Sequence, residues 1–122
     1  MIGILAFFNL QFLLNLNVST YCFDSRGNTP LHLATARNRF ENVALILNNE
    51  LAHSPTSLSL RAYNQQGWTP LHLACRKGYL NVIKLFLENK AESNIVSSSG
   101  SGELTPLMVA AQFGHHKVVQ VL

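Results

Sequence analysis

The sequence predicts an all-α solenoid, in which small helix-turn-helix units stack and short β-hairpin-like loops join them. Residues 29–34 read Thr-Pro-Leu-His-Leu-Ala, and the same string returns at 69–74. A weaker copy, Thr-Pro-Leu-Met-Val-Ala, occupies 105–110. After each of the first two copies, apolar residues recur at three- and four-residue spacing, which predicts a helix with one broad buried face. A unit this small cannot bury that face alone, so its neighbours must stack on it.

The first helix of each unit has a clear start. Threonine supplies a side-chain oxygen that accepts a hydrogen bond from the first helical turn, and proline suits the first helical position because its N–H is not needed there. The starts are Thr29-Pro30, Thr69-Pro70 and Thr105-Pro106. We expect these helices to end at Asn38, Gly78 and Gly114, whose residue types readily adopt a left-handed conformation.

Second helices are expected over 40–47 and 80–87, which align without gaps. Before the first two helix pairs, residues 24–28 and 64–68 place Asp or Asn three positions ahead of Gly, the pattern of a tight turn at a hairpin tip. Each unit is therefore expected to contain a hairpin, a first helix, a turn and a second helix.

The repeat organises the chain as one domain. Its parts are a degraded partial unit at 1–20, a unit with an inserted loop at 24–60, a unit at 64–100 and a truncated unit at 101–122, within a single domain of 1–122. Carrying the repeat backwards makes the apolar stretch 1–16 the second helix of a preceding unit. The alternative is a signal peptide, which needs a positive flank, but no Lys or Arg precedes Arg26. Polar residues inside the stretch argue against a membrane span.

Composition narrows the functional classes. The 122 residues suffice for one domain, and 48% hydrophobic with 12% charged residues indicates either a fragment with apolar ends or a module normally covered by neighbours. The net charge of +3 is small, whereas nucleic-acid binding usually requires a dense basic patch, so no nucleic-acid partner is expected. Cys22 and Cys75 form neither a disulfide framework nor a zinc site. We expect Cys75 to be a buried thiol in a reducing compartment.

Residues 27–34 and 67–74 resemble the ankyrin repeat, whose signature is Thr-Pro-Leu-His-x-Ala and whose period is about 33 residues. The third copy departs from the signature, with Met108 where histidine is expected. The spacing of the copies exceeds the ankyrin period, which implies a larger insertion near 52–58 and a smaller one within 97–102. The chain also resembles an interior slice of a longer array, with further ankyrin repeats at one or both ends.

A finer resemblance is to the inhibitors of NF-kappa-B and the ankyrin halves of NF-kappa-B precursors. A long connection after residues 26–34, with Ala-Tyr-Asn at 62–64 ahead of Gly67, is similar to an insertion between two inner repeats of those proteins. This resemblance covers about residues 22–90. Two features depart from it: the chain is mildly basic, and it has neither a paired-serine phosphodegron nor an acidic tail.

No residue pattern predicts catalysis. His32 and His72 recur at the same place in their repeats, whereas catalysis needs a single arranged site. The ankyrin resemblance implies instead that each histidine makes structural hydrogen bonds that tie the turn of one unit to the next. His115 and His116 are adjacent, so they point in different directions on a helix and cannot readily share a metal. We expect no enzyme activity, no cofactor and no metal site.

The resemblance also implies a concave face, lined by hairpin tips and first helices, that binds a partner protein. The variable positions on this face surround each Gly-x-Thr-Pro string and the end of each first helix. The predicted partner-binding residues are Ser25, Arg26, Asn28, Arg37, Gln65, Gln66, Trp68, Arg76, Lys77, Gln112 and Phe113, with Ala36 and Leu104 beside them. Four of these residues are positively charged, and tryptophan and arginine dominate the energetics of many interfaces. The alternative is that Trp68 packs only on its own hairpin and that the charges are solvated.

These observations predict a non-catalytic interaction module, cytoplasmic or nuclear, that binds an acidic or mixed segment of a partner protein as a transcription-factor inhibitor or a scaffold. The alternative is a regulatory or scaffolding ankyrin segment of a larger membrane protein or enzyme, although no membrane span is expected within these residues. A secreted chain that uses 1–16 as its signal is a third interpretation.

Overall fold

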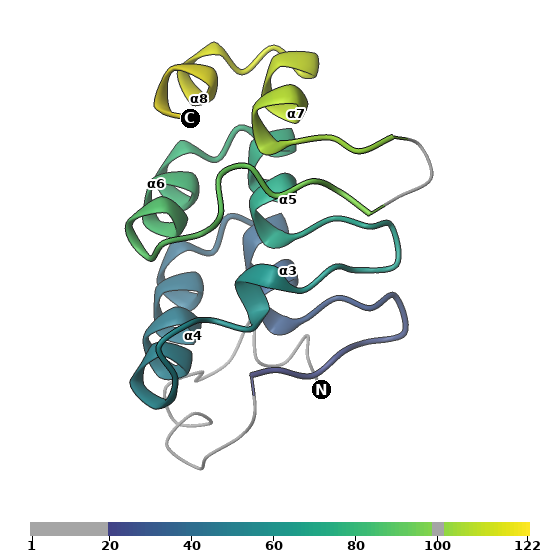
Figure 1. The fold of residues 1–122 in the computed structure, drawn as a ribbon. Helices are drawn as coiled ribbons and strands as arrows, with labels where there is room; N and C mark the ends of the chain where they lie inside the picture. Colours follow the sequence, from purple (N-terminus) through teal and green to yellow (C-terminus); the bar gives the residue numbers. More distant parts are fainter. Residues whose placement is uncertain (1–19, 99–101) are drawn as a thin grey trace.

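A computed structural model describes residues 20–98 and 102–122, which form stacked helix pairs joined by projecting hairpins (Figure 1). The first helices of the pairs are α3 (Pro30–Ala36), α5 (Pro70–Lys77) and α7 (Pro106–Gln112). The second helices are α4 (Phe40–His53), α6 (Leu80–Glu88) and α8 (His116–Val121). Within the described ranges no residue lies in a strand, and the all-α prediction is confirmed.

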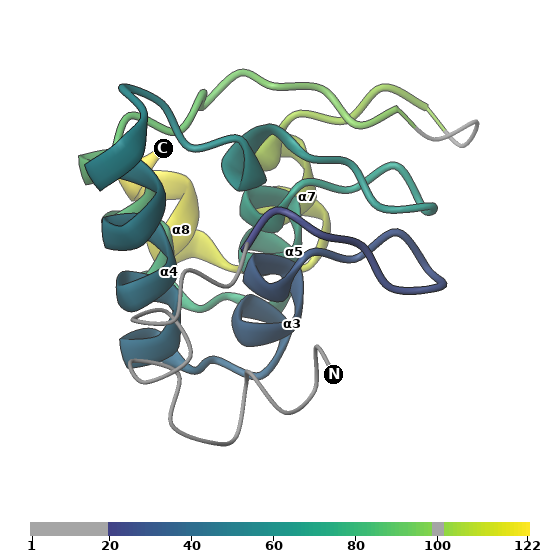
Figure 2. The ribbon, with the colours of Figure 1, turned by 90° about the horizontal axis from the view of Figure 1, so that it is seen from below.

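The helices form two layers. Helix α5 packs between α3 and α7 in one layer, and α6 contacts α4 and α8 in the other. Seen from below, the hairpins all project from the layer of first helices, on the same side of the stack (Figure 2). The hairpins and the first helices therefore enclose a concave face, as the resemblance implied.

Each first helix begins as the sequence predicts. The side chains of Thr29, Thr69 and Thr105 each accept a hydrogen bond from the backbone N–H three residues on, and proline follows each threonine. The predicted ends are also confirmed, because Asn38, Gly78 and Gly114 have φ values of 53°, 74° and 77°. Gly78 meets a second requirement that the sequence does not reveal. A Cβ atom at Gly78 would lie 2.6 Å from the ring of His115, so any other residue would require that ring to move.

The hydrophobic core lies between the two layers. Leu31, Leu71 and Val109 enter it from the first helices, and Phe86, Ile83 and Val118 from the second helices, each no more than 2% exposed. Burying a side chain of this size stabilises the fold by about 1.5–3 kcal/mol relative to leaving it in water. The apolar periodicity of the sequence therefore corresponds to the surface that holds neighbouring units together.

The hairpins are closed by hydrogen bonds and are also joined to one another. Asp24 N–H donates to the Asn28 carbonyl, and Asn64 N–H donates to the Trp68 carbonyl, both at 3.0 Å. Neighbouring hairpins are joined where Gln65 N–H donates to the Arg26 carbonyl at 2.9 Å. The first two hairpins are therefore joined to each other through their main chains.

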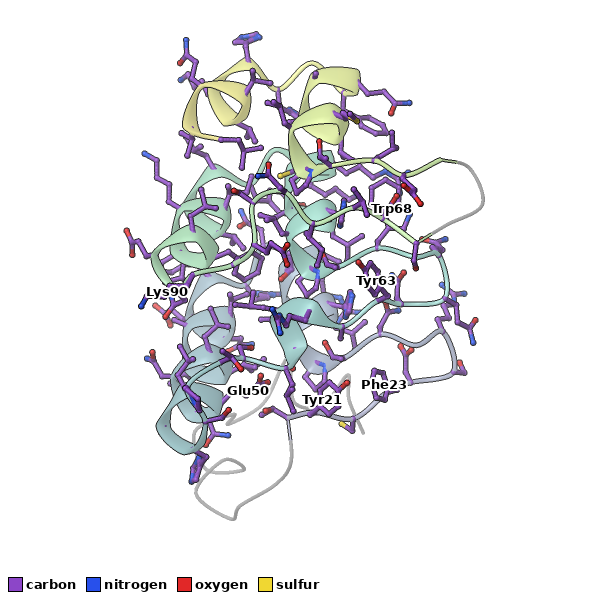
Figure 3. All side chains as sticks on the ribbon, viewed as in Figure 1. Tyr21, Phe23, Glu50, Tyr63, Trp68 and Lys90 are labelled. Atoms are coloured by element: carbon purple, nitrogen blue, oxygen red, sulfur yellow. The ribbon has the colours of Figure 1, made fainter. Side chains whose placement is uncertain are left out.

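In the insertion predicted near 52–58, residues 54–58 lie outside any helix, whereas 52 and 53 extend the second helix of the first unit. Helix α4 continues through His53, and the short 3₁₀ helix η1 (Ser59–Arg61) closes the segment. The Glu50 carboxylate, labelled in Figure 3, explains this order, because it accepts hydrogen bonds from the hydroxyls of Ser57 at 2.7 Å and Ser59 at 2.6 Å. It also accepts from the Ser59 N–H at 3.1 Å and from the Thr20 hydroxyl at 2.8 Å.

Several sequence predictions fall wholly or partly outside the described residues. The helix or signal at 1–16 lies outside them, as do residues 1–19 of the degraded unit and 99–101 of the smaller insertion. The division into units at 1–20, 24–60, 64–100 and 101–122 stays a proposal, as do further repeats at either end. Across the described ranges, no helix combines the length and the apolar character that a membrane span requires.

Candidate functional site

A histidine in each of the first two units joins that unit to the next hairpin. His32 lies on α3, and its Nε2 is 2.9 Å from the Trp68 carbonyl oxygen of the following hairpin. His72 lies on α5, and its Nε2 is 2.8 Å from the Leu104 carbonyl oxygen. The structural role that the resemblance implied for both histidines is confirmed.

The other ring nitrogen fixes the protonation state of each histidine. Thr29 N–H donates to Nδ1 of His32 at 3.1 Å, and Thr69 N–H donates to Nδ1 of His72 at 3.3 Å. Because Nδ1 accepts, Nε2 must carry the proton that is donated to the carbonyl. Each ring is therefore the neutral Nε2–H tautomer, and a second proton on Nδ1 would break the bond to threonine.

Burial acts in the same direction. It lowers the pKa of both His32 and His72 below the ordinary value, although the carbonyl groups that face the rings partly oppose the shift. The neutral imidazole, which holds the units together, is thus favoured near neutral pH.

The third unit lacks this tie. Met108 occupies the histidine position and is 51% exposed. Its backbone N–H still donates to the Thr105 hydroxyl at 3.3 Å, so the threonine cap survives without the histidine. The sequence departure at Met108 is therefore a real structural difference.

Two hollows lie along the concave face, between the hairpins and the first helices. The first hollow has a volume of about 210 Å³. It is lined by Arg26, Asn28, His32, Leu33, Ala36, Asn64, Gln65, Gln66 and Leu73. The second hollow is wider, about 650 Å³, and more open. It is lined by Gln66, Trp68, Arg76, Leu104, Gln112 and Phe113.

The second hollow combines a cation with aromatic surface. The Arg76 guanidinium carbon lies 5.5 Å from the centre of the Phe113 ring, within the range of a cation–π contact. The Trp68 ring meets the His72 ring edge to face, with 5.6 Å between the ring centroids. No acidic side chain is among the residues that line either hollow.

The structure brings most of the predicted partner-binding residues together. The hollows include Arg26, Asn28, Gln65, Gln66, Trp68, Arg76, Gln112 and Phe113. Ser25, Arg37 and Lys77 are exposed but line neither hollow. Leu33, Leu73 and Asn64 line the first hollow and were absent from the predicted set. Leu33 and Leu73 belong to the repeated string, whereas the predicted partner-binding set was drawn from the variable positions around it.

Trp68 occupies two environments at once. Its side chain is half-buried and packs against the hydrophobic core, as well as lining the second hollow. It therefore packs beyond its own hairpin and still presents surface to the concave face.

The reactive side chains among the described residues are placed for structure. Cys22 and Cys75 are not joined in a disulfide, and burial raises the pKa of Cys75 to about 12, which keeps it protonated. His115 Nε2 is 2.8 Å from the Arg76 carbonyl oxygen, which is another contact between units. Within the described ranges, no three His, Cys, Asp or Glu side chains are grouped so that they could hold a metal ion.

Stacked helix pairs, main-chain ties between units and an open concave face define a helical-repeat binding module. A family model described as ankyrin repeats in three copies matches residues 50–122, and a model of the ankyrin repeat matches residues 26–57. The chain belongs to the ankyrin-repeat family. Ankyrin repeats are generally protein–protein interaction modules, and domains built from them are typically non-catalytic. No curated protein matches the chain.

Proposed function

We propose that this chain binds an acidic segment of a partner protein through its concave face. The observation that carries the proposal is the charge of the two hollows, which contain Arg26 and Arg76 and no acidic lining residue. Both arginines are exposed, and a guanidinium fork matches the geometry of a carboxylate. A partner segment with carboxylates would therefore be steered to this face and held there.

The proposed biological role is inhibition of a transcription factor or scaffolding, without catalysis by this chain. The inserted segment supports the first role, because it lies where the sequence resembles the NF-kappa-B inhibitors. A reducing compartment, cytoplasmic or nuclear, is proposed because Cys22 and Cys75, the two cysteines of the chain, are not joined in a disulfide. The identity of the bound partner distinguishes inhibitor from scaffold.

The experiment reverses charge on and off the concave face. The double variant R26E/R76E changes both hollows, while R61E/K84E makes the same charge change at two exposed residues that line neither. Partners captured by the unaltered chain are identified, and their affinity is then measured for both variants. We expect R26E/R76E to weaken binding about tenfold or more, the equivalent of about 1.4 kcal/mol, because reversal repels the carboxylates.

R61E/K84E should bind almost as the unaltered chain does, and neither double variant should lower the melting temperature, since all four side chains are exposed. If both double variants weaken binding of the partner equally, the effect comes from the overall charge of the chain rather than from a binding site. Undiminished binding to R26E/R76E would contradict the concave-face proposal.

A further inference from the structure

We propose that the two hollows bind different parts of one extended partner segment. The second hollow is an anchor site for an acidic residue that neighbours a large apolar side chain. The first hollow binds the main chain of the same segment, and Arg26, which lines it, favours further negative charge there. This inference rests on the proposed function and adds the chemistry of the ligand at each end of the face.

The charged part of the anchor is Arg76. Its guanidinium carbon lies 5.5 Å from the centre of the Phe113 ring, a contact that limits the freedom of the side chain. Among residues 20–98 and 102–122 the guanidinium makes no hydrogen bond or ion pair. Glu103, next to Leu104 in the sequence, is exposed and does not line the hollow. A carboxylate of a bound partner is the group that pairs best with this guanidinium.

The apolar part of the anchor is the surface around Arg76. Phe113 is 45% exposed, and Trp68 and Leu104 are half-buried, so the hollow presents uncovered aromatic and aliphatic surface beside the cation. At about 650 Å³ the hollow has room for a large side chain. An apolar residue next to the carboxylate would cover this surface and exclude water from the ion pair, the arrangement found at interface hot spots.

The walls of the anchor are fixed before a ligand arrives. The carbonyls of Trp68 and Leu104 face His32 and His72 at 2.9 Å and 2.8 Å, so both main-chain segments are tied to the helix layer. A site whose backbone is already ordered loses less conformational entropy when it binds. This favours the second hollow as the position where affinity is concentrated.

The first hollow has different chemistry. Gln65 and Gln66 are exposed there, and each side-chain amide offers both a donor and an acceptor. These groups match the N–H and C=O groups of an extended main chain, which every residue supplies. Asn64 is already committed to its own hairpin, because its side-chain oxygen accepts from the N–H groups of Gln66 and Trp68, each at 3.0 Å. Gln66 lines both hollows and so connects the two parts of the segment.

A nucleic-acid strand could also stack on Trp68 and Phe113, but it would need a continuous basic groove for its phosphates. Of the two hollows, each contains a single arginine and no lysine. A peptide with one acidic residue matches this charge density better than a polyanion does.

The test uses peptides selected by the full chain from a random library displayed on phage. We expect the selected peptides to share an Asp or Glu within two residues of an apolar side chain such as Phe, Trp or Leu. Trp68 is the single tryptophan of the chain, so binding is then followed by its fluorescence, using synthetic peptides free of tryptophan. Matched peptides with Gln for the acidic residue, or Ala for the apolar one, should each bind about tenfold more weakly.

Two matched pairs of variants locate the anchor. R76Q should lose about tenfold in affinity for the selected peptide, and R61Q, which removes an exposed arginine outside both hollows, should lose almost nothing. F113A should behave like R76Q, while F23A is its control, because Phe23 is 50% exposed on a hairpin arm and lines neither hollow (Figure 3).

Selected peptides without the acidic–apolar pair would overturn the inference, and so would peptides that bind R76Q and F113A undiminished. Tight binding of oligo(dT) that depends on Arg76 would overturn it in favour of nucleic acid. The proposed function fails separately. If a captured partner binds R26E/R76E more weakly than the unaltered chain but contains no acidic–apolar pair, only the anchor is wrong. If the partner binds R26E/R76E as tightly as the unaltered chain, both the anchor and the proposed function are wrong.

Discussion

The first two units and the third share the Thr-Pro helix start but differ in whether a side chain of that helix joins its unit to a neighbouring hairpin. His32 and His72 use Nδ1 within their own unit and Nε2 to reach the next hairpin. Met108 does neither, yet Thr105 still caps α7. The difference shows that starting a helix and joining two units are separate tasks, although one histidine performs both where it is present.

Removing the tie should have the largest effect. H72A leaves the Thr69 N–H and the Leu104 carbonyl without their partner in a site where His72 is 0% exposed. We expect the free energy of unfolding to fall by about 2–4 kcal/mol, because each buried unsatisfied group costs about 1–3 kcal/mol. Urea denaturation followed by circular dichroism measures it. The control M108A should change stability by less than about 0.5 kcal/mol, since Met108 is exposed, and equal losses in both variants would contradict the comparison.

Acid should weaken the tied units next. Burial lowers the pKa of His32 and His72 below their ordinary value of 6.5, so the unfolded chain binds more protons than the folded chain as pH falls below that value. Stability is therefore fully present above pH 6.5 and declines from there toward the lowered pKa values. The urea midpoint at pH 7.5, 6.0 and 5.0 measures the decline. The variant H32Q/H72Q, which cannot titrate at these positions, should give a flatter profile, and an unchanged slope would refute this account.

The smallest expected effect comes from giving the third unit a histidine. M108H can restore the bond inside its own unit, from the Thr105 N–H to Nδ1, whereas the described residues include no later hairpin for its Nε2 to reach. We expect a gain of about 0.5–1 kcal/mol, less than H72A loses, because only one hydrogen bond at a half-exposed site is added. The gain should vanish in T105A/M108H relative to T105A. A gain as large as the loss in H72A would mean that the contact within the unit, rather than the tie to the next hairpin, supplies the stability.

The sequence predicted the parts of the fold that follow local rules. Thr-Pro starts, left-handed ends and apolar periodicity each depend on a few neighbouring residues, and the described helices follow them. The order of the inserted segment could not be predicted, because the Glu50 carboxylate brings together Thr20 and Ser59, which lie far apart in the sequence. The contact of Gly78 with His115 has the same cause. Such contacts depend on how the units stack. The repeat predicts that the units stack but does not specify which side chains meet.

Most of the residues chosen from the sequence line one of the hollows, but the choice was less accurate at the ends of the first helices. Ala36 and Arg76 line the hollows, whereas their neighbours Arg37 and Lys77 do not. Successive residues at a helix end point about 100° apart, so two neighbours can differ in whether they face a hollow, although Gln112 and Phe113 at the end of α7 both line the second one. Choosing between them needs the direction of the hairpin, which the sequence alone does not give.

The residues that receive the histidine ties have a further consequence for how this surface can change. Trp68 and Leu104 are held through their carbonyl oxygens, which every amino acid possesses, while their side chains line the second hollow. Either side chain can therefore be exchanged, in evolution or in a combinatorial library, without loss of the hydrogen bond between the histidine and the main-chain carbonyl. Single substitutions at these two positions can change the ligand preference while the histidine ties stay in place, although both side chains also pack against the hydrophobic core.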